Sequence, residues 1–451
     1  MPKKLVKKRK RHISFICPPL VLPYLASYMP KDSKINIVDE FIDDIDFNEK
    51  YDLVCITVTI DNACRAYEIS QIFRERDILV VMGGPHINSV PQEAEKFADA
   101  IVIGELEEVW KNFLEDFNSG RIKKRYQAKN RFNMTSMPFP RHDLINWSKY
   151  EVIYGNIAIP VEGSRGCIHN CSFCLSPSIY KEGVRYRPLL EVIEEIKRIN
   201  KEIRWKKKVI FFIDDDLASD INRACELFSY LRSLKIYWVA YFTTLNAGNE
   251  KLVKLASHSG CTGLFVGFES INPQVLETAK KKFNILENYI RCIKNCRKNN
   301  INLTASFIFG FPEDSLSRFY KTIEFVIKYK FPLVAIQVLV PFPNTTIYEI
   351  LRERKLLCED EFWLRPFQPW GLIKNENFSK ENISLEDAYK LSIKRLYRWR
   401  SILRRSLSTR KYFLFYLSYN LLQKIITNKR CCILCKKIKI GFLNLTEKIK
   451  K

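Results

Sequence analysis

Short apolar runs alternate with amphipathic stretches over the first 120 residues. The apolar runs are rich in Val and Ile, as expected of strands buried in a parallel sheet, and apolar residues at helical spacing fill the intervals. The predicted strands are His12–Cys17, Lys34–Asp39, Leu53–Thr59, Ile78–Met82 and Ala100–Ile103. The predicted helices are Leu20–Met29, Asn62–Arg76, Pro91–Phe97 and Glu105–Phe117. This order predicts a doubly wound α/β domain over residues 12–122, with a ligand at the carboxyl ends of its strands.

A second α/β pattern follows a polar stretch, 123–150, which contains Pro138 and Pro140 and is typical of a linker. Residues 151–345 alternate strands and helices again. The predicted strands are Asn156–Glu162, Val209–Ile213, Trp238–Thr243, Gly263–Phe268, Leu303–Phe309 and Leu333–Val340. Six strand–helix units predict an incomplete (β/α)6 barrel, with its site at the carboxyl ends of the strands.

Three cysteines follow the first strand of this second pattern. Cys167, Cys171 and Cys174 stand four and then three residues apart, and Phe173 directly precedes the last of them. Three thiolates on one short loop suit a four-iron cluster and leave one iron open to a ligand. A zinc ion would need a fourth ligand, and His169 is the one local candidate. The motif therefore favours chemistry at an open iron, with a structural iron–sulfur or zinc site as the alternative.

The C-x-x-x-C-x-aromatic-C loop resembles that of the radical S-adenosylmethionine (SAM) superfamily. The resemblance implies that Cys167, Cys171 and Cys174 hold a [4Fe-4S] cluster whose open iron binds SAM. It also implies that an electron from the reduced cluster splits SAM to a 5′-deoxyadenosyl radical. The fold expected from the resemblance is the incomplete barrel that the strand pattern predicts independently.

Other strand ends of the predicted barrel resemble SAM-binding motifs of the same superfamily. Asp214–Asp216 stand where many members have Gly-Gly-Glu, although an acidic turn at a helix start explains them equally well. Gly267–Ser270 is similar to the G-x-E-S stretch. Ser306–Glu313 is similar to the adenine-side motif, with Ser306 in place of the first glycine. The residues that the resemblance assigns to SAM are Phe173, Asp214, Asp215, Glu269, Ser270, Ile308 and Gly310.

Strand ends of the first domain resemble the cobalamin-binding domain of one branch of the superfamily. The residues that this resemblance assigns to cobalamin are Thr57, Thr59, Gly83, Gly84, His86, Gly104 and Glu105. Two features depart from the family's pattern. The chain has no Asp-x-His-x-x-Gly stretch, and its first loop, Cys17–Pro19, is short. A domain that has lost the cofactor is therefore the alternative interpretation.

Much of the net charge of +24 lies in Lys3–Arg11, within a basic tail of residues 1–11, and after Lys390, within a helical basic C-terminal region of residues 346–451. Leu385–Arg405 is a predicted helix of this region, and Tyr412–Ile426 is aromatic and apolar with basic flanks. They could cap the open side of the barrel, lie on an anionic membrane, or contact nucleic-acid phosphates, and we favour these placements in that order. Cys431, Cys432 and Cys435 are weak candidates for a second cluster. The 14 cysteines show no paired extracellular spacing, which favours a reducing cytoplasm.

The resemblance implies a cobalamin-dependent radical SAM enzyme, and we expect a methyltransferase acting on an unactivated carbon of a small-molecule or lipid-like substrate. Flavodoxin or ferredoxin is the expected electron donor. One alternative is tRNA methylthiolation, which would use N-terminal cysteines, and Cys17, Cys55 and Cys64 are the candidates. The other is a non-catalytic basic iron–sulfur module on RNA or a membrane. Arg165 could steer an anion or pair with a carboxylate, and both roles stay open.

Overall fold

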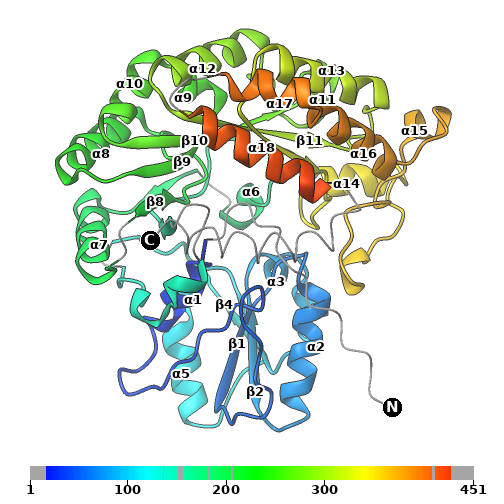
Figure 1. Ribbon diagram of the computed structural model, residues 1–451. Helices are drawn as coiled ribbons and strands as arrows, with labels where there is room; N and C mark the ends of the chain where they lie inside the picture. Colours follow the sequence, from blue (N-terminus) through cyan, green and yellow to red (C-terminus); the bar gives the residue numbers. More distant parts are fainter. Residues whose placement is uncertain are drawn as a thin grey trace, which may run out of the picture.

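The computed structural model describes residues 17–427, apart from 136, 151–155, 181–182, 205–206 and 409–411. Two parallel sheets organise the described residues, one in each half of the molecule (Figure 1). The smaller, N-terminal sheet has the order β1–β2–β3–β4. Its strands are β1 (Leu53–Thr57), β2 (Leu79–Gly83), β3 (Ala100–Ile103) and β4 (Arg125–Gln127).

Helices cover both faces of the smaller sheet. Successive residues of a strand point to opposite faces, so Val80 and Met82 of β2 pack in one apolar cluster and Val81 in another. The first cluster contains α2 (Ala63–Arg74) and the second contains α5 (Trp110–Asn118). Figure 1 shows these two helices on opposite sides of the sheet. The predicted doubly wound α/β domain is confirmed.

Three details of this domain differ from the prediction or cannot be compared with it. Lys34–Asp39 is not a strand, because Asp39 turns the chain there by accepting a hydrogen bond from the Phe41 amide at 3.0 Å. The predicted strand His12–Cys17 lies outside the described residues except for its last residue. The stretch expected to be a linker contributes β4, which pairs with β3, so the sheet continues beyond residue 122.

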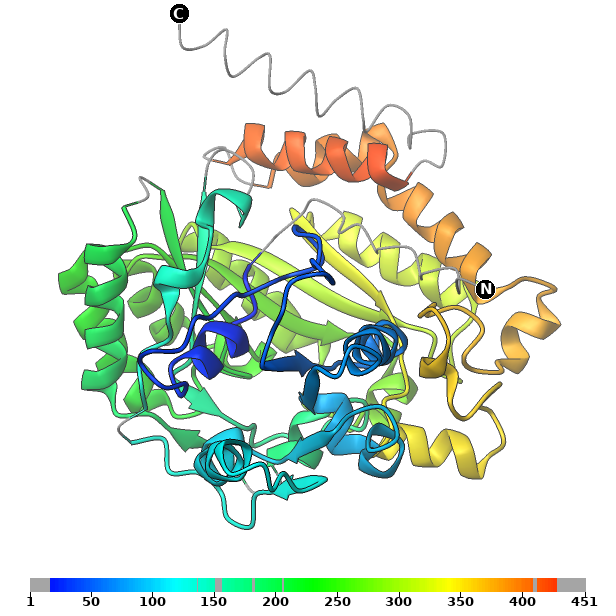
Figure 2. The same ribbon diagram turned by 90° about the horizontal axis from the view of Figure 1, so that it is seen from below.

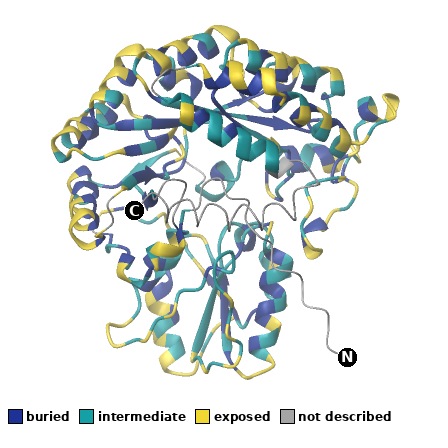
Figure 3. Ribbon diagram, viewed as in Figure 1, coloured by how far each residue is buried: buried dark blue, intermediate teal, exposed yellow. Residues whose placement is uncertain are grey.

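The larger sheet is the predicted open barrel of six parallel strands, in the order β5–β8–β9–β10–β11–β12. The strands are β5 (Ile157–Val161), β8 (Lys208–Phe212), β9 (Trp238–Phe242), β10 (Cys261–Glu269), β11 (Asn302–Phe309) and β12 (Leu333–Val338). The covering helices are α7 (Leu189–Glu202), α8 (Ile221–Leu234), α10 (Glu250–His258), α12 (Leu286–Lys298) and α13 (Leu316–Lys328). Their apolar faces pack on the strands, and Figure 3 shows the buried residues concentrated there.

The C-terminal region has two parts that pack on different neighbours. Its first part includes α14 (Thr346–Glu353) and a turn of helix, Phe362–Leu364, and joins the apolar cluster of the N-terminal domain. Trp363 donates a hydrogen bond to Glu93 of that domain at 2.9 Å. This first part therefore connects the two halves of the molecule, which the sequence did not predict.

The second part covers the edge of the barrel, as the capping hypothesis predicted. The helix expected over Leu385–Arg405 is divided into α16 (Leu385–Leu396) and α17 (Trp399–Ser406), followed by α18 (Phe413–Thr427). The Tyr389 hydroxyl donates to the Ile336 carbonyl of the edge strand β12 at 3.2 Å. Figures 1 and 2 show these helices in orange to red along one side of the barrel. Among the described residues, no helix is long and apolar enough to cross a membrane.

Candidate functional site at the mouth of the barrel

The cysteine loop lies between the two-residue strand β6 (Ser164–Arg165) and the short helix α6 (Ser176–Tyr180). Its middle residue, Ser172, is fully buried and is held from two directions. Its amide and hydroxyl donate to the carbonyls of Ala279 and Thr278 at 3.1 and 2.6 Å, and its carbonyl accepts from the Ile347 amide at 2.8 Å. These contacts fix the loop at the carboxyl ends of the barrel strands.

All three cysteines of the loop are free thiols. Burial raises the pKa of Cys171 to about 12 and that of Cys174 to about 11, and it also raises the pKa of Cys167. Backbone amides already point at two of the sulfurs: His169 N–H at Cys167 Sγ over 3.5 Å, and Ser176 N–H at Cys174 Sγ over 3.4 Å. Metal ligation requires thiolates, so filling this loop must release protons.

The loop fits an iron–sulfur cluster better than a zinc ion. The thiols are close enough that Cys167 and Cys174 both raise the pKa of Cys171. Three thiolates match the cysteine ligation of a four-iron cluster, whereas a tetrahedral zinc ion needs a fourth ligand. The His169 ring packs on Phe283, with ring centroids 4.6 Å apart, which gives it a role other than ligation.

The acidic triplet after β8 has members with different roles. Asp214 accepts hydrogen bonds from the Gly163 amide and the Ser164 hydroxyl, at 3.1 and 2.5 Å, and burial raises its pKa to about 7. It therefore anchors the start of the cysteine loop. Burial also raises the pKa of Asp216, to about 6, and this carboxylate accepts from Asn246 at 2.8 Å.

Asp215 is the member of the triplet that lies next to the cysteines. The Ser176 hydroxyl donates to it, and its charge raises the pKa of both Cys167 and Cys174. Burial raises the pKa of Asp215 itself. Two acids were assigned to SAM from the sequence. Asp215 lies beside the cluster site, whereas both oxygens of the Asp214 carboxylate accept hydrogen bonds from the chain itself.

The end of β10 combines an unusual backbone with a buried ion pair. Glu269 has φ +59°, a left-handed conformation that is uncommon for a residue other than glycine. Its Oε1 accepts from Lys281 Nζ at 2.7 Å. Tyr289 donates to the carbonyls of Phe268 and Ser270, at 2.8 and 2.7 Å, and keeps the strand end in place. Strained backbone held by several contacts is typical of functional sites.

The end of β11 reaches the cysteine loop through aromatic contact. Phe173 lies edge-on to Phe311, with ring centroids 6.3 Å apart. Gly310 has φ +108°, and its amide and that of Phe311 donate to Asp314 at 2.9 and 3.0 Å. Burial raises the pKa of Asp314 to about 7. The structure therefore places Phe173 against Phe311, the residue after Gly310, and it adds Asp314, which the sequence did not single out.

The strand ends of the N-terminal domain are packed more tightly by the chain itself. Gly84 has φ +108°, and a Cβ there would stand 2.8 Å from the Val58 carbonyl oxygen. Gly104 has φ +85°, and its Cβ would stand 2.8 Å from that of Ala128. The Thr59 hydroxyl donates to Asp61 at 2.6 Å. The fold alone therefore accounts for these three cobalamin candidates.

His86 and Glu105, two further cobalamin candidates, differ in how the chain engages them. His86 is buried with its ring against Trp363 and Nε2 3.6 Å from Glu93 Oε1, but neither of its ring nitrogens has a hydrogen-bond partner among the described residues. Glu105 accepts from Arg185 Nη2 at 2.9 Å and from Arg165 Nη1 at 3.0 Å.

Thr57 and Gly83 are the cobalamin candidates that the fold does not explain. A Cβ at Gly83 would meet nothing closer than 3.7 Å, so packing does not demand a glycine there. No side-chain hydrogen bond of Thr57 is found among the described residues. The Thr57 hydroxyl is free to bind a ligand, and Gly83 beside it has no side chain. Together they suit a bulky ligand that approaches the backbone closely.

Arg165 joins the two domains immediately before the cysteine loop. Its guanidinium pairs with Glu105 and Glu107, which follow β3, at 3.0 and 2.6 Å, and with Glu162, which follows β5, at 2.9 Å. The carboxyl edges of the two sheets therefore face each other at this point. Of the two roles that the sequence left open for Arg165, the structure has the pairing with carboxylates.

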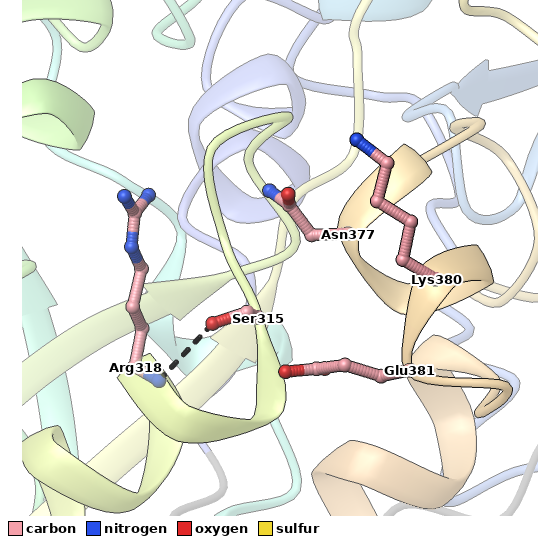
Figure 4. A pocket seen from close by; sticks show the side chains of 5 residues that line it. All are labelled: Ser315, Arg318, Asn377, Lys380 and Glu381. Atoms are coloured by element: carbon pink, nitrogen blue, oxygen red, sulfur yellow. Dashed lines mark hydrogen bonds between the residues drawn. The ribbon is translucent and has the colours of Figure 1, made fainter.

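A polar hollow of about 270 Å³ lies elsewhere, between the start of α13 and α15 (Glu376–Lys380) (Figure 4). Its lining residues are Ser315, Arg318, Asn377, Lys380 and Glu381. None of them is a predicted site residue. The candidate site is therefore defined by the converging strand ends, and this hollow is separate from it.

Comparison with known proteins gives consistent matches. The family model of the radical SAM superfamily matches residues 161–326. Bacteriochlorophyllide d C-12(1)-methyltransferase of Chlorobaculum tepidum is 32% identical over 340 residues, 74% of this chain and 74% of that protein. The C-8(2)-methyltransferase of the same organism is 31% identical over 398 residues, 86% and 87% of the two chains.

A solved structure matches over the whole architecture. It is the radical SAM methyltransferase TsrM of Kitasatospora setae with cobalamin and a [4Fe-4S] cluster bound, at TM-score 0.69 and 14% identity. The match covers 92% of this chain and 97% of that one. The arrangement of an N-terminal α/β domain facing an open barrel is therefore an established fold.

Proposed function

The chain belongs to the radical SAM superfamily, and on this basis we propose that it is a cobalamin-dependent methyltransferase of an unactivated carbon. The observation that carries the proposal is the three-cysteine loop where the carboxyl edges of the two sheets meet. The relatives named above are methyltransferases, and the matching solved structure contains both cofactors. The enzyme cleaves SAM reductively with a [4Fe-4S] cluster.

Each part of the site has a task in this chemistry. Cys167, Cys171 and Cys174 would hold the cluster. When bound, the cluster supplies the electron that splits SAM, and cobalamin supplies the methyl group. Asp215 would accept a hydrogen bond from the ammonium of SAM, since a carboxylate is the strongest acceptor for such a donor. Burial of Cys171 keeps water from its thiol, and water would otherwise weaken the electrostatic interactions there.

The remaining SAM candidates surround this position. Glu269 and Ser270 end β10, and their polar groups would serve the ribose or methionine part of SAM. Ile308 and Gly310 end β11 beside Phe173, where they would pack on the adenine. For cobalamin, the Thr57 hydroxyl would donate or accept a hydrogen bond, and the backbone at Gly83 would allow the ligand to approach closely.

The observations favour this function over tRNA methylthiolation. That alternative needs a second cluster held by N-terminal cysteines. Cys17 donates to the Ala158 carbonyl of β5 over 3.5 Å, and Cys55 lies within β1, where burial raises its pKa to about 12. Each is thus engaged in the fold at a separate place. Cys431, Cys432 and Cys435 lie outside the described residues.

The substrate we propose is a small-molecule or lipid-like compound, and the electron donor a flavodoxin or ferredoxin of the cytoplasm. Peripheral contact with an anionic membrane is supported by α17. Trp399, Leu403 and Leu407 are 58, 46 and 61% exposed and recur every fourth residue, beside Arg400 and Arg404. No acidic residue occurs from 388 to 446. Such a face suits anionic lipid headgroups.

Vesicle sedimentation tests the membrane contact. The protein should sediment with phosphatidylserine-containing vesicles, and a variant with Trp399→Ser and Leu403→Ser should remain in the supernatant. Equal recovery of the wild type with neutral and anionic vesicles would contradict the proposal.

A cleavage assay tests the enzymatic proposal. The anaerobically reconstituted protein should convert SAM to 5′-deoxyadenosine under strong reductant, contain about four irons, and show corrin absorbance after loading with cobalamin. Cys171→Ala should lose the iron and the cleavage together. Cys225→Ala, which removes a free thiol from α8, should retain both and serves as the matched control. Unchanged turnover in Cys171→Ala would refute the assignment.

A further inference from the structure

Lys281 is a buried cation in a segment that is bound to the cysteine loop. It is 8% exposed and lies between α11 (Pro273–Thr278) and α12. Ala279, two residues before it, accepts the Ser172 amide at 3.1 Å, and Phe283, two residues after it, packs on the His169 ring. The backbone on both sides of Lys281 therefore contacts the loop that carries the three cysteines.

The neighbouring lysines show that this burial is specific. The side chain of Lys282 is 74% exposed and pairs with Glu277 on the surface, and Lys280 is exposed as well. Lys281 points inward, where its Nζ donates to Glu269 at 2.7 Å and to the Gly267 carbonyl at 3.4 Å. A buried lysine carries its charge at a considerable desolvation cost unless it is paired.

Gly267 makes room for this pair. A Cβ at that position would stand 2.3 Å from Glu269 Oε1 and 2.9 Å from Lys281 Nζ. Gly267 of the G-x-E-S stretch is therefore a glycine for a steric reason, because a side chain there would displace the ion pair. The left-handed backbone of Glu269 points its carboxylate back along the strand end, over that glycine, toward the lysine.

The charge of Lys281 acts on the cysteine loop. The segment that carries Lys281 is hydrogen-bonded to Ser172 and packs on His169, and both of these residues belong to that loop. A buried cation at this position favours negative charge in the loop. On the other side of the loop, Asp215, which accepts a hydrogen bond from the Ser176 hydroxyl, contributes a negative charge.

We propose that Lys281 is a positioning residue that tunes the cluster and orients Glu269 toward SAM. Reduction adds an electron to the cluster, and a buried cation beside it stabilises the reduced form. The same ion pair holds the Glu269 carboxylate in one orientation. This inference rests on the proposed function, because it requires a cluster in the loop.

The test is the midpoint potential of the reconstituted cluster without SAM, followed by electron paramagnetic resonance. Lys281→Met should make one-electron reduction about tenfold less favourable, which corresponds to about 59 mV more negative. Glu269→Gln should shift the potential in the opposite direction, because it leaves the lysine unbalanced. Lys281→Arg should stay near the wild type. Lys282→Met, the exposed neighbour, is the matched control and should not shift it.

SAM affinity, measured by equilibrium dialysis, is the second measurement. It should fall at least several-fold in Lys281→Met and recover in Lys281→Arg. If Lys281→Met does not retain iron, Lys281→Gln, which still hydrogen-bonds Glu269, replaces it in both experiments. Shifts of the same sign in the lysine and glutamate variants, or shifts no larger than that of Lys282→Met, would overturn the inference. Failure of the wild type to bind iron would instead overturn the proposed function.

Discussion

The carboxyl edges of the two sheets face each other, but the polar side chains at the two edges have different partners. At the barrel edge, charged side chains stay close to the cysteine loop: Asp215 on one side, and Glu269 with Lys281 on the other. At the N-terminal edge, most of the corresponding polar groups have partners in the chain itself, as Glu105 has in Arg165 and Arg185. A motif residue therefore indicates a ligand only when the fold leaves that residue unexplained.

One buried network links the two edges, and breaking it should have the largest effect on stability. Arg165→Met removes the cation that pairs with Glu107 and Glu162 and leaves Glu105 with Arg185 alone, so we expect a loss of about 3–5 kcal/mol in the free energy of unfolding. Urea denaturation measures it. Arg141→Met removes an exposed pair with Asp143 and should cost no more than about 1 kcal/mol. Equal losses in the two variants would show that the network does not join the domains.

Substitution of two adjacent glycines of the N-terminal edge by alanine should affect different properties, stability at Gly84 and cofactor retention at Gly83. Gly84→Ala places a Cβ against the Val58 carbonyl at positive φ and should cost about 2–4 kcal/mol, measured by urea denaturation. Gly83→Ala fits the chain and should change stability by no more than about 1 kcal/mol. Gly83→Ala should nevertheless reduce corrin retention, measured by absorbance after desalting. Full retention in a stable Gly83→Ala protein would remove Gly83 from the cofactor site.

The pH dependence of stability should reveal the buried acid of the barrel edge. The pKa of Asp214 is raised from 3.8 to about 7, so the folded state binds the proton more tightly than the unfolded state. Its contribution is present below about pH 4 and is lost as the pH rises through about 7. Asp214→Asn mimics the neutral carboxyl and should remove about 4 kcal/mol of this decline.

Thermal unfolding from pH 4 to 8 measures the effect of Asp214→Asn. Asp143→Asn, at an exposed position where Arg141 lowers the pKa of the carboxyl, is the control and should keep the decline seen in the wild type. A decline of the same size in Asp214→Asn would mean that Asp214 is ionised throughout this range.

The architecture could be predicted from the sequence because it follows from periodicity. All six barrel strands were located to within a few residues, since each is an apolar run between amphipathic helices. Lys34–Asp39 was wrong because its mixed polarity did not reveal that Asp39 closes a turn. The helix over Leu385–Arg405 was wrong in its continuity, because the break at Tyr397 and Arg398 carries no glycine or proline signal.

The candidate site could be predicted only in part. The cysteine spacing is local and was sufficient to identify the loop. Lys281 was missed because it stands in a run of three lysines, and burial of the middle one depends on a glycine fourteen residues away. Asp314 was missed because its role is to accept hydrogen bonds from two backbone amides across a turn, and no sequence pattern shows this. The pairing of Arg165 with Glu105 could not be predicted because Glu105 lies sixty residues earlier in the chain.

The attachment of Ser172 has a consequence for biosynthesis. Its last anchor, the Ile347 amide, follows the final strand of the barrel in the chain, and the Thr278 and Ala279 carbonyls precede that strand. A nascent chain that has not yet been translated past this point cannot complete the cradle around the thiols. The pocket that holds the three thiols is therefore expected to form only after the chain has been synthesised beyond Ile347.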